Sequence, residues 1–329
     1  MPLESIFNVE RRLSLGWILR SFGWLLLIVA LAVGARRLLE KPARIPPPGP
    51  GEKDTVVDGV RWRSREVEGA GTETTVFVHG LLTSSASWGR VLPAAGERGH
   101  AIAVDLPGFG YSDRPWPYDY AVGGQSAHLL HFLDARAIDH AVLVGSSLGG
   151  AVALLTAAAR PDRVRALVLV DAASPASRIP WTIRALRTPG IGELEMELYI
   201  KPFLEFGLRE RLYANPKNVT PELVEREWRP VTVPGTRRAA LAAIRSNVRG
   251  YESLWQKFQV PTLVIWGLDD RLLPVAEGHR LASLIPGAKL VVLPGAGHLP
   301  QEEQPEAFSR AVSEFLDGLP SEDSSVPVQ

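Results

Sequence analysis

The sequence Gly-Ser-Ser-Leu-Gly at positions 145–149 constrains the fold more than any other feature. It directly follows the apolar run Ala141–Val144 and precedes a helix-like run that extends to Arg160. A serine on a tight turn between a strand and a helix has a strained backbone, and small flanking residues are needed to avoid clashes there. Such a turn lifts the hydroxyl of Ser147 above the sheet and places the N–H of Leu148 at the start of the helix. The segment therefore predicts a nucleophile and half of an oxyanion hole.

Short apolar runs alternate with helical patterns from about residue 55 onward. Most of these runs lack polar–apolar alternation, which indicates strands buried on both faces, as in a parallel sheet covered by helices. We expect strands at Thr74–Val78, Ala101–Asp105, Ala141–Val144, Ala166–Val170, Thr262–Trp266 and Lys289–Leu293. We expect helices at Trp88–Gly96, Gly124–Ala137, Leu148–Arg160, Val275–Leu284 and Gln304–Leu316. The segment Val56–Val67 is compatible with an antiparallel hairpin at the edge.

The alternation breaks once, between Asp171 and Thr262, where about 90 helix-rich residues intervene. That length is implausible for a loop within a compact domain. We expect a helical cap over residues 175–260, inserted at the carboxyl edge of the sheet, where sites of α/β proteins form. A helical subdomain without a role in the site is the alternative. The cap divides the core into residues 55–174 and 261–318, and the tail, 319–329, is expected to be disordered.

The N-terminal segment differs from the rest of the chain. Leu13–Ala35 is almost wholly apolar, is interrupted mainly by Arg20, and has arginine pairs on both sides. About 21 helical residues span about 30 Å, enough to cross a bilayer. We therefore expect residues 1–40 to be a single-pass membrane anchor of open orientation, followed by a proline-rich spacer at 41–54. A cleaved signal peptide ending at Val33–Ala35 and a helix lying in the membrane interface are the alternatives.

Composition excludes several classes of function. The chain has 36 Lys and Arg and 36 Asp and Glu, and it contains no basic run of the kind that binds nucleic acid. It has no cysteine, which excludes disulfides, thiolate zinc sites and a cysteine nucleophile. No cluster of ligand residues predicts a metal or an organic cofactor.

A serine nucleophile needs an imidazole to take its proton and a carboxylate to fix the imidazole tautomer. His298 stands in a glycine-rich loop just past the last predicted strand, whereas the other histidines occupy positions typical of solvated or packing roles. Asp269 and Asp270 follow the strand that ends at Trp266, and either could be the carboxylate. The chain order serine, aspartate, histidine is that of a known hydrolase arrangement.

The second oxyanion donor is predicted after the first buried strand, at His79-Gly80-Leu81. Glycine allows close backbone approach, so the N–H of Leu81 can face the same oxyanion as that of Leu148. We expect His79 to be structural and not a base.

The segments HGLLTSSASW, DLPGFGYSDRP, GSSLGG, WGLDDRLLP and GAGH occur in the order and approximate spacing typical of the α/β-hydrolase superfamily. The resemblance covers roughly residues 70–317. The chain looks most like the cap-bearing, serine-nucleophile branch, which includes carboxylesterases, lipases and meta-cleavage-product C–C hydrolases. In that branch the acid stands three residues after the glycine of the WGxxD segment, which implies Asp270, 28 residues before His298. Asp269 is the fallback.

The same resemblance separates possible relatives. Haloalkane dehalogenases and epoxide hydrolases have aspartate in place of Ser147, and proline iminopeptidases usually have tryptophan in place of Leu148. C–C hydrolases usually have asparagine where this chain has Ser146, a departure that weakens that interpretation.

The resemblance implies an α/β-hydrolase core with a helical cap that cleaves ester or thioester bonds of apolar small-molecule or lipid-derived substrates through an acyl-enzyme. It implies no cofactor. The substrate pocket is expected to include Leu82, Trp88 and Trp181. The alternatives are a C–C bond hydrolase, an acyltransferase or perhydrolase, and a non-catalytic binding member of the fold.

Overall fold

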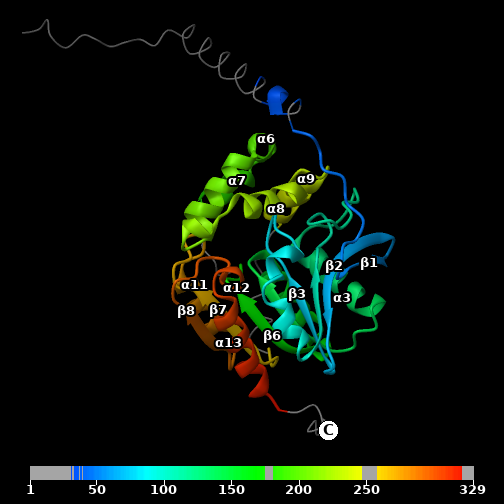
Figure 1. Ribbon diagram of the computed structural model, residues 1–329, viewed down its shortest axis with the longest axis vertical. Helices are drawn as coiled ribbons and strands as arrows, with labels where there is room; N and C mark the ends of the chain where they lie inside the picture. The colour runs from blue at the N-terminus through cyan, green and yellow to red at the C-terminus, as the bar shows by residue number, and fades with distance from the viewer. Residues whose placement is uncertain are drawn as a thin grey trace, which may run out of the picture. The chain divides into compact units, whose positions relative to one another are not determined.

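The computed structural model describes residues 31, 33–36, 38, 40–174, 181–246 and 258–320, and the chain divides into two compact units, Met1–Lys41 and Pro42–Gln329. Within its described residues, the second unit is built on an eight-stranded sheet of order β1-β2-β4-β3-β5-β6-β7-β8 (Figure 1). The strands are β1 Glu52–Val57, β2 Val60–Glu68, β3 Glu73–Val78, β4 Gly99–Val104, β5 Ala141–Ser146, β6 Val164–Val170, β7 Thr262–Gly267 and β8 Lys289–Leu293.

The sheet is mostly parallel, as the continuous apolar runs predict. Strands β3 to β8 pair in parallel, and every residue of β5 and β7 is buried. The exception is the hairpin of β1 and β2 at the edge of the sheet. These two strands are antiparallel to each other, and β2 is also antiparallel to its other neighbour, β4. Its two-residue turn, Asp58-Gly59, has positive φ at both positions, the geometry that suits right-handed strand twist.

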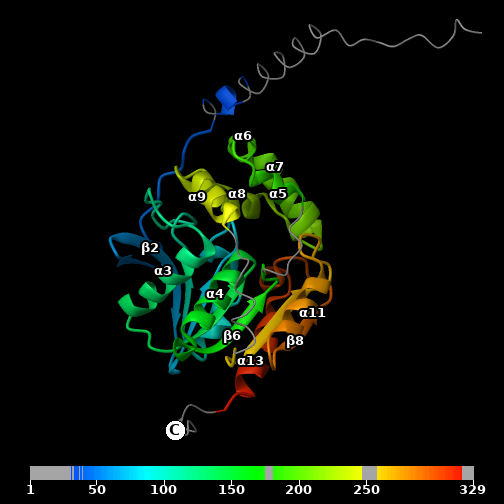
Figure 2. The same ribbon diagram turned by 180° about the vertical axis from the view of Figure 1, so that it is seen from behind.

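Helices cover both faces of the sheet. One apolar cluster joins β-strand side chains to Phe132, Val152 and Leu281, and the other joins them to Leu92 and Phe308. The first face therefore carries α3 (Val122–Ala135), α4 (Leu148–Ala159) and α11 (Val275–Leu284), and the second carries α2 (Leu92–Gly96) and α13 (Pro305–Asp317), as Figure 2 shows for α3 and α4.

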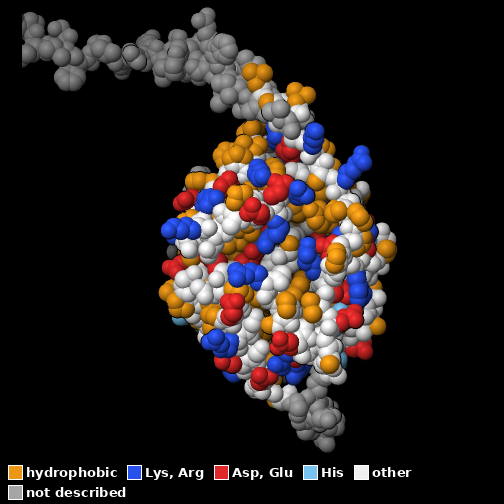
Figure 3. All heavy atoms as spheres, in the orientation of Figure 1, with side chains coloured by type: hydrophobic (Ala, Val, Ile, Leu, Met, Phe, Trp, Pro, Cys, Tyr) orange, Lys and Arg blue, Asp and Glu red, His pale blue; other side chains and the backbone are white. Residues whose placement is uncertain are grey.

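The cap helices lie between β6 and β7. Among the described residues they include α5 Trp181–Leu186, α6 Ile191–Leu198, α7 Lys201–Gly207, the π-helical turn η3 Leu208–Leu212, the short turn η4 Pro216–Asn218, α8 Pro221–Val231 and α9 Thr236–Arg245. The cap has an apolar cluster of its own around Leu208 and Trp228, which Leu299 of the core also joins. Charged side chains of both signs are interspersed over the face in Figure 3. The cap's large exposed apolar side chains include Ile191, Leu194, Ile200, Phe203 and Phe206.

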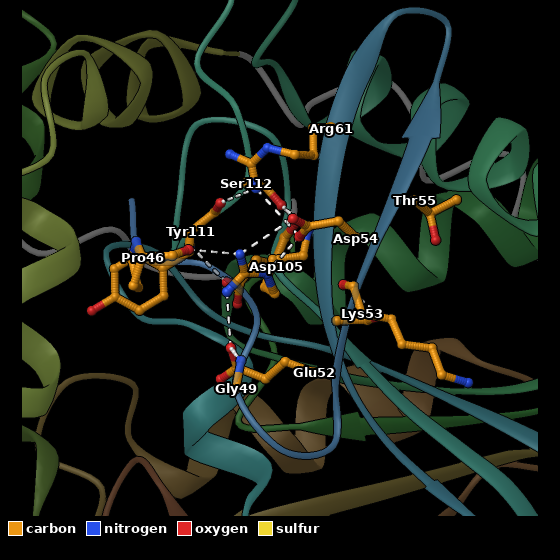
Figure 4. A network of polar contacts seen from close by, with 12 residues as sticks. Pro46, Gly49, Glu52, Lys53, Asp54, Thr55, Arg61, Asp105, Tyr111 and Ser112 are labelled. Carbon is orange, nitrogen blue, oxygen red and sulfur yellow. Dashed lines mark hydrogen bonds and ion pairs between the residues drawn. The ribbon is translucent and has the colours of Figure 1, made fainter. Parts of the chain in front are cut away.

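The proline-rich stretch is bound to the globular unit. The N–H of Ala43 donates to the Thr232 hydroxyl at 3.3 Å, and the buried Arg63 guanidinium donates to the Pro46 carbonyl at 2.9 Å. Figure 4 shows this end of the stretch among Glu52, Asp54 and their partners. The predicted spacer, 41–54, is therefore too long: residues 52–54 belong to the core, because strand β1 already pairs with β2 there.

No helix within the described part of the chain is long and apolar enough to cross a bilayer. The predicted anchor Leu13–Ala35 lies, apart from residues 31 and 33–35, outside the described residues.

Candidate active site

Ser147 occupies a strained turn between β5 and α4, with φ 52° and ψ −117°. A Cβ on Gly149 would lie 2.2 Å from the carbonyl oxygen of Val78, and one on Gly145 would lie 2.4 Å from the carbonyl oxygen of Gly149. Only glycine fits at these two positions. Such strain is retained where the surrounding structure enforces it, typically at functional sites.

The loop after β3 passes directly beside this serine. A Cβ on Gly80 would lie 3.2 Å from the Cβ of Ser147, so any larger residue would press on the serine. The next residue, Leu81, lines the same cavity as Leu148, the first residue of α4. The first N–H groups of a helix have no intrahelical acceptor and are available to an anion. The two backbone segments predicted to hold an oxyanion therefore flank Ser147.

His298 and Asp270 form a buried pair. The imidazole Nδ1 lies 2.7 Å from Oδ2 of Asp270, whose Oδ1 accepts the N–H groups of Leu272 at 2.7 Å and Leu273 at 2.9 Å. Burial opposes ionisation of Asp270, but the His298 imidazole and the Leu273 N–H together hold its pKa below the usual range. An ionised Asp270 requires the proton on Nδ1, which leaves Nε2 free to act as a base.

Asp269, the fallback acid, has a different partner. It is exposed and accepts the N–H of Gly295 at 3.1 Å. The structure therefore places Asp270, and not Asp269, on His298.

A cavity opens in front of Ser147, between core and cap. Its lining is mainly aliphatic and comprises Leu81, Val122, Ser147, Leu148, Ala151, Ala173, Ser174, Ile183, Arg187, Ala243, Ile244, Ser246, Leu272 and Leu273.

Two of the three predicted pocket residues do not line this cavity. Trp88 is fully buried, and its ring centroid lies 5.1 Å from that of Phe77 and 6.2 Å from that of Phe308, beneath the sheet. Its size and apolarity are used in the core. Leu82 has positive φ and packs against the core and cap clusters. The side chain of Trp181 lies outside the described residues.

A sequence profile of the alpha/beta hydrolase fold matches residues 75–305. The chain belongs to the α/β-hydrolase family. It is 32% identical over 267 residues to a 2-hydroxy-6-oxo-2,4-heptadienoate hydrolase of Pseudomonas putida, covering 75% of this chain and 90% of that protein.

Two solved structures resemble this hydrolase in different ways. A meta-cleavage product hydrolase from Pseudomonas fluorescens is 27% identical with a TM-score of 0.67, and the match covers 80% of this chain and 97% of that one. A membrane phospholipase A, described as a bacterial virulence factor, is 25% identical with a TM-score of 0.64, and the match covers 92% of this chain and 95% of that one.

His79 has the structural role expected of it. Its Nε2 accepts the N–H of Leu106 at 3.1 Å, so its Nδ1 carries the proton and donates to the carbonyl of Gly80 at 2.7 Å. Burial lowers the pKa of this imidazole, which favours the neutral form. His79 thereby fixes the glycine that approaches Ser147.

Sequence reasoning missed Asp171, a fully buried carboxyl at the end of β6 in this hydrolase. Its backbone has φ 42°, its Oδ1 accepts the N–H of Gly267 at 3.0 Å, and its Oδ2 meets no N–H donor among the described residues. Ligand atoms of Asp171, Asp270 and His298 all lie within 4.8 Å of one another. A metal fits this cluster poorly. Asp270 already accepts three N–H groups, and Nδ1 of His298, the atom that would bind the metal, carries a proton. The buried carboxyls of Asp171 and Asp270 are more suited to sharing a proton than to binding a metal.

A second group of two carboxylates and a histidine, Glu66, Glu68 and His100, lies on the neighbouring strands β2 and β4. Glu66 is held there by Arg136 at 2.6 Å and Lys53 at 3.0 Å, so cations of the chain already occupy this site.

Replacing Asp171 by Asn should change how stability depends on pH. Burial, followed by the charge of Asp270, raises the pKa of Asp171 well above its ordinary value of 3.8. The folded protein then keeps a proton that the unfolded chain releases, so its free energy of unfolding falls as pH rises above that value. Asp171→Asn keeps the acceptor for Gly267 and has no proton to lose. We expect its Tm, relative to wild type, to increase by several degrees between about pH 4 and about pH 8.

Thermal unfolding followed by circular dichroism across this pH range measures the difference. A Tm difference that is constant or decreases with pH would show that Asp171 is ionised in the folded protein.

Proposed function

We propose that this hydrolase cleaves carboxylic ester bonds of apolar, lipid-derived substrates through an acyl-enzyme on Ser147. The observation that carries the proposal is the aliphatic cavity that opens onto this strained serine. An acyl chain gains roughly 0.8 kcal/mol for each CH₂ that it buries. Few groups in this lining could form hydrogen bonds with a polar substrate.

In the proposed reaction, Nε2 of His298 takes the proton of Ser147 as Oγ attacks the ester carbonyl carbon. The N–H groups of Leu81 and Leu148 stabilise the tetrahedral oxyanion, an effect worth about 3–4 kcal/mol per donor in comparable sites. His298 then protonates the departing alcohol. Water, deprotonated by the same imidazole, attacks the acyl-enzyme and releases the carboxylic acid, which restores Ser147. Asp270 keeps the imidazole in the required tautomer throughout.

The lipid-derived substrate class rests on two observations. The similarity to a membrane phospholipase A covers 92% of this chain, more than the globular core alone. The sequence also carries the apolar segment Leu13–Ala35 with arginine pairs on both sides, which we infer to be a membrane anchor. An anchored hydrolase meets esters that are dissolved in or released from the bilayer.

A C–C bond hydrolase is the second candidate, favoured by the heptadienoate hydrolase relative and by one cavity residue. Arg187 lines the cavity, and its guanidinium donates to the carbonyls of Ile244 at 2.9 Å and Ser246 at 3.3 Å. A cation there suits a substrate with a carboxylate. Against this candidate, Ser146 replaces the usual asparagine, and the rest of the lining is mainly aliphatic.

Two measurements on the full-length protein separate these proposals: whether it stays in membranes washed with alkaline carbonate, and which substrate it turns over there. We expect the protein to stay in the washed membranes and to hydrolyse p-nitrophenyl esters with an optimum at medium or long acyl chains. We expect turnover of a 2-hydroxy-6-oxo-dienoate to be at least about 100-fold slower in kcat/KM. Membranes without the protein give the background. Faster cleavage of the dienoate would establish the C–C reaction, and loss of the protein in the wash would contradict the anchor.

A further inference from the structure

The loop that carries His298 is bound to the cap. The N–H of His298 donates to the carbonyl of Leu212 at 2.7 Å, at the end of the π-helical turn η3. The preceding residue is equally close, because a Cβ on Gly297 would lie 2.5 Å from that carbonyl oxygen and 2.7 Å from the nitrogen of Ala214. The cap segment Leu212–Asn215 and the loop therefore meet backbone to backbone.

A single carboxylate closes this contact. Glu303, the last residue of α12 (Pro300–Glu303), accepts three backbone N–H groups. Its Oε2 lies 2.6 Å from the nitrogen of Gly297 and 3.0 Å from that of Ala214, and its Oε1 lies 3.2 Å from that of Asn215. An ionised carboxylate that accepts N–H groups from two segments fixes their distance more strictly than a neutral acceptor does, because charge-assisted bonds are shorter and stronger.

The neighbouring carboxylate has different partners. Glu302 accepts the guanidinium of Arg226 at 2.6 Å and 2.7 Å and the hydroxyl of Tyr213 at 3.0 Å, all from cap side chains. Its carboxylate holds the cap to the core, whereas that of Glu303 holds the cap to the histidine loop. The two residues therefore form a matched pair for experiment.

We propose that Glu303 is a positioning residue, which joins the cap segment Leu212–Asn215 to Gly297 and so fixes the imidazole of His298. The proposal rests on the catalytic role proposed for His298. The placement of the cap is thereby transmitted to the base through two contacts, the Glu303 carboxylate on the N–H of Gly297 and the Leu212 carbonyl on the N–H of His298. A displacement of about 1 Å in a catalytic group can cost on the order of 100-fold in rate.

The test compares Glu303→Ala, Glu303→Gln and Glu302→Gln in the full-length protein. Loss of the carboxylate should lower kcat by about 10–100-fold with KM nearly unchanged, because the cavity is intact and only the base is displaced. Gln keeps one acceptor oxygen and should restore part of kcat. Glu302→Gln should lower kcat by less than about threefold. Hydrogen exchange should become faster at residues 296–298 in Glu303→Ala but not in Glu302→Gln, because the Glu302 carboxylate meets this contact only on the cap side, at the hydroxyl of Tyr213.

Wild-type kcat in Glu303→Ala, or equal losses of kcat in the Glu302 and Glu303 variants, would overturn the proposal. If Glu303→Ala does not fold, Glu303→Gln is compared with wild type in its place, and its Tm serves as the check on folding. Failure of the proposed function is a separate result, because wild type itself would then lack ester turnover, whether or not a fluorophosphonate labels it.

Discussion

Replacement of Ser147 by Ala should abolish ester hydrolysis, with a loss in kcat of about 10⁴–10⁶-fold, as for other serine triads. The reaction loses its nucleophile, and the oxyanion donors alone leave a small residual rate. The fold should be unaffected, because alanine has the same Cβ beside Gly80 and the same backbone strain at φ 52°. Turnover of the preferred p-nitrophenyl ester by purified full-length protein in detergent measures the loss, with Tm as the check on folding.

Ser146→Ala is the matched control. This neighbouring serine is buried at the end of β5, and its hydroxyl has no hydrogen-bond partner within the part of the chain that the structure describes. Its loss should leave kcat within about threefold. A fluorophosphonate should label wild type and Ser146→Ala but not Ser147→Ala. Turnover that survives in Ser147→Ala would remove Ser147 as the nucleophile, and labelling without ester turnover would direct attention to C–C substrates or other acyl acceptors.

The strands of the core were predictable because parallel strands that are buried on both faces have continuous apolar sequences. The range predicted for one late helix, Val275–Leu284, is that of α11 in the structure. Ser147 stands on a strand-to-helix turn for a similarly local reason, since glycines at 145 and 149 are required by contacts within a few residues or with the adjacent strand.

The contacts of Asp171 and Glu303 join residues that are far apart in the chain, so no local pattern reports them. One signal for Asp171 was nevertheless present. An acid directly after a buried strand, at the edge where Asp270 and His298 also emerge, meets the rule that selected Asp270. Glu303 gives no such signal, because its partners in the cap are fixed only when the insertion docks.

Trp88 shows a different limit of sequence reasoning. Its position near the predicted oxyanion loop suggested that it lines the pocket. The sequence does not show, however, on which face of the sheet an aromatic side chain packs. The structure uses it between Phe77 and Phe308, on the side of the sheet that α13 covers.

Asp270→Asn should lower kcat by about 10⁴-fold while the fold is retained. Asparagine can still accept the N–H groups of Leu272 and Leu273 through its oxygen. Its amide then faces Nδ1 of His298 as a donor, which drives the imidazole proton to Nε2. In that tautomer the nitrogen facing Ser147 is already protonated and cannot take the seryl proton. KM should change little, because Asp270 does not line the cavity.

Asp269→Asn is the control that separates tautomer from charge. It removes the same charge one residue away, but its partner is the N–H of Gly295 and its oxygen still accepts that bond. Its kcat should stay within about threefold of wild type. A large loss in Asp269→Asn with near-normal turnover in Asp270→Asn would make Asp269 the catalytic acid. Equal moderate losses in both would mean that charge near the loop matters more than the tautomer of His298. The expected large difference between two adjacent carboxylates follows only if the 2.7 Å contact between Asp270 and His298 sets the proton position.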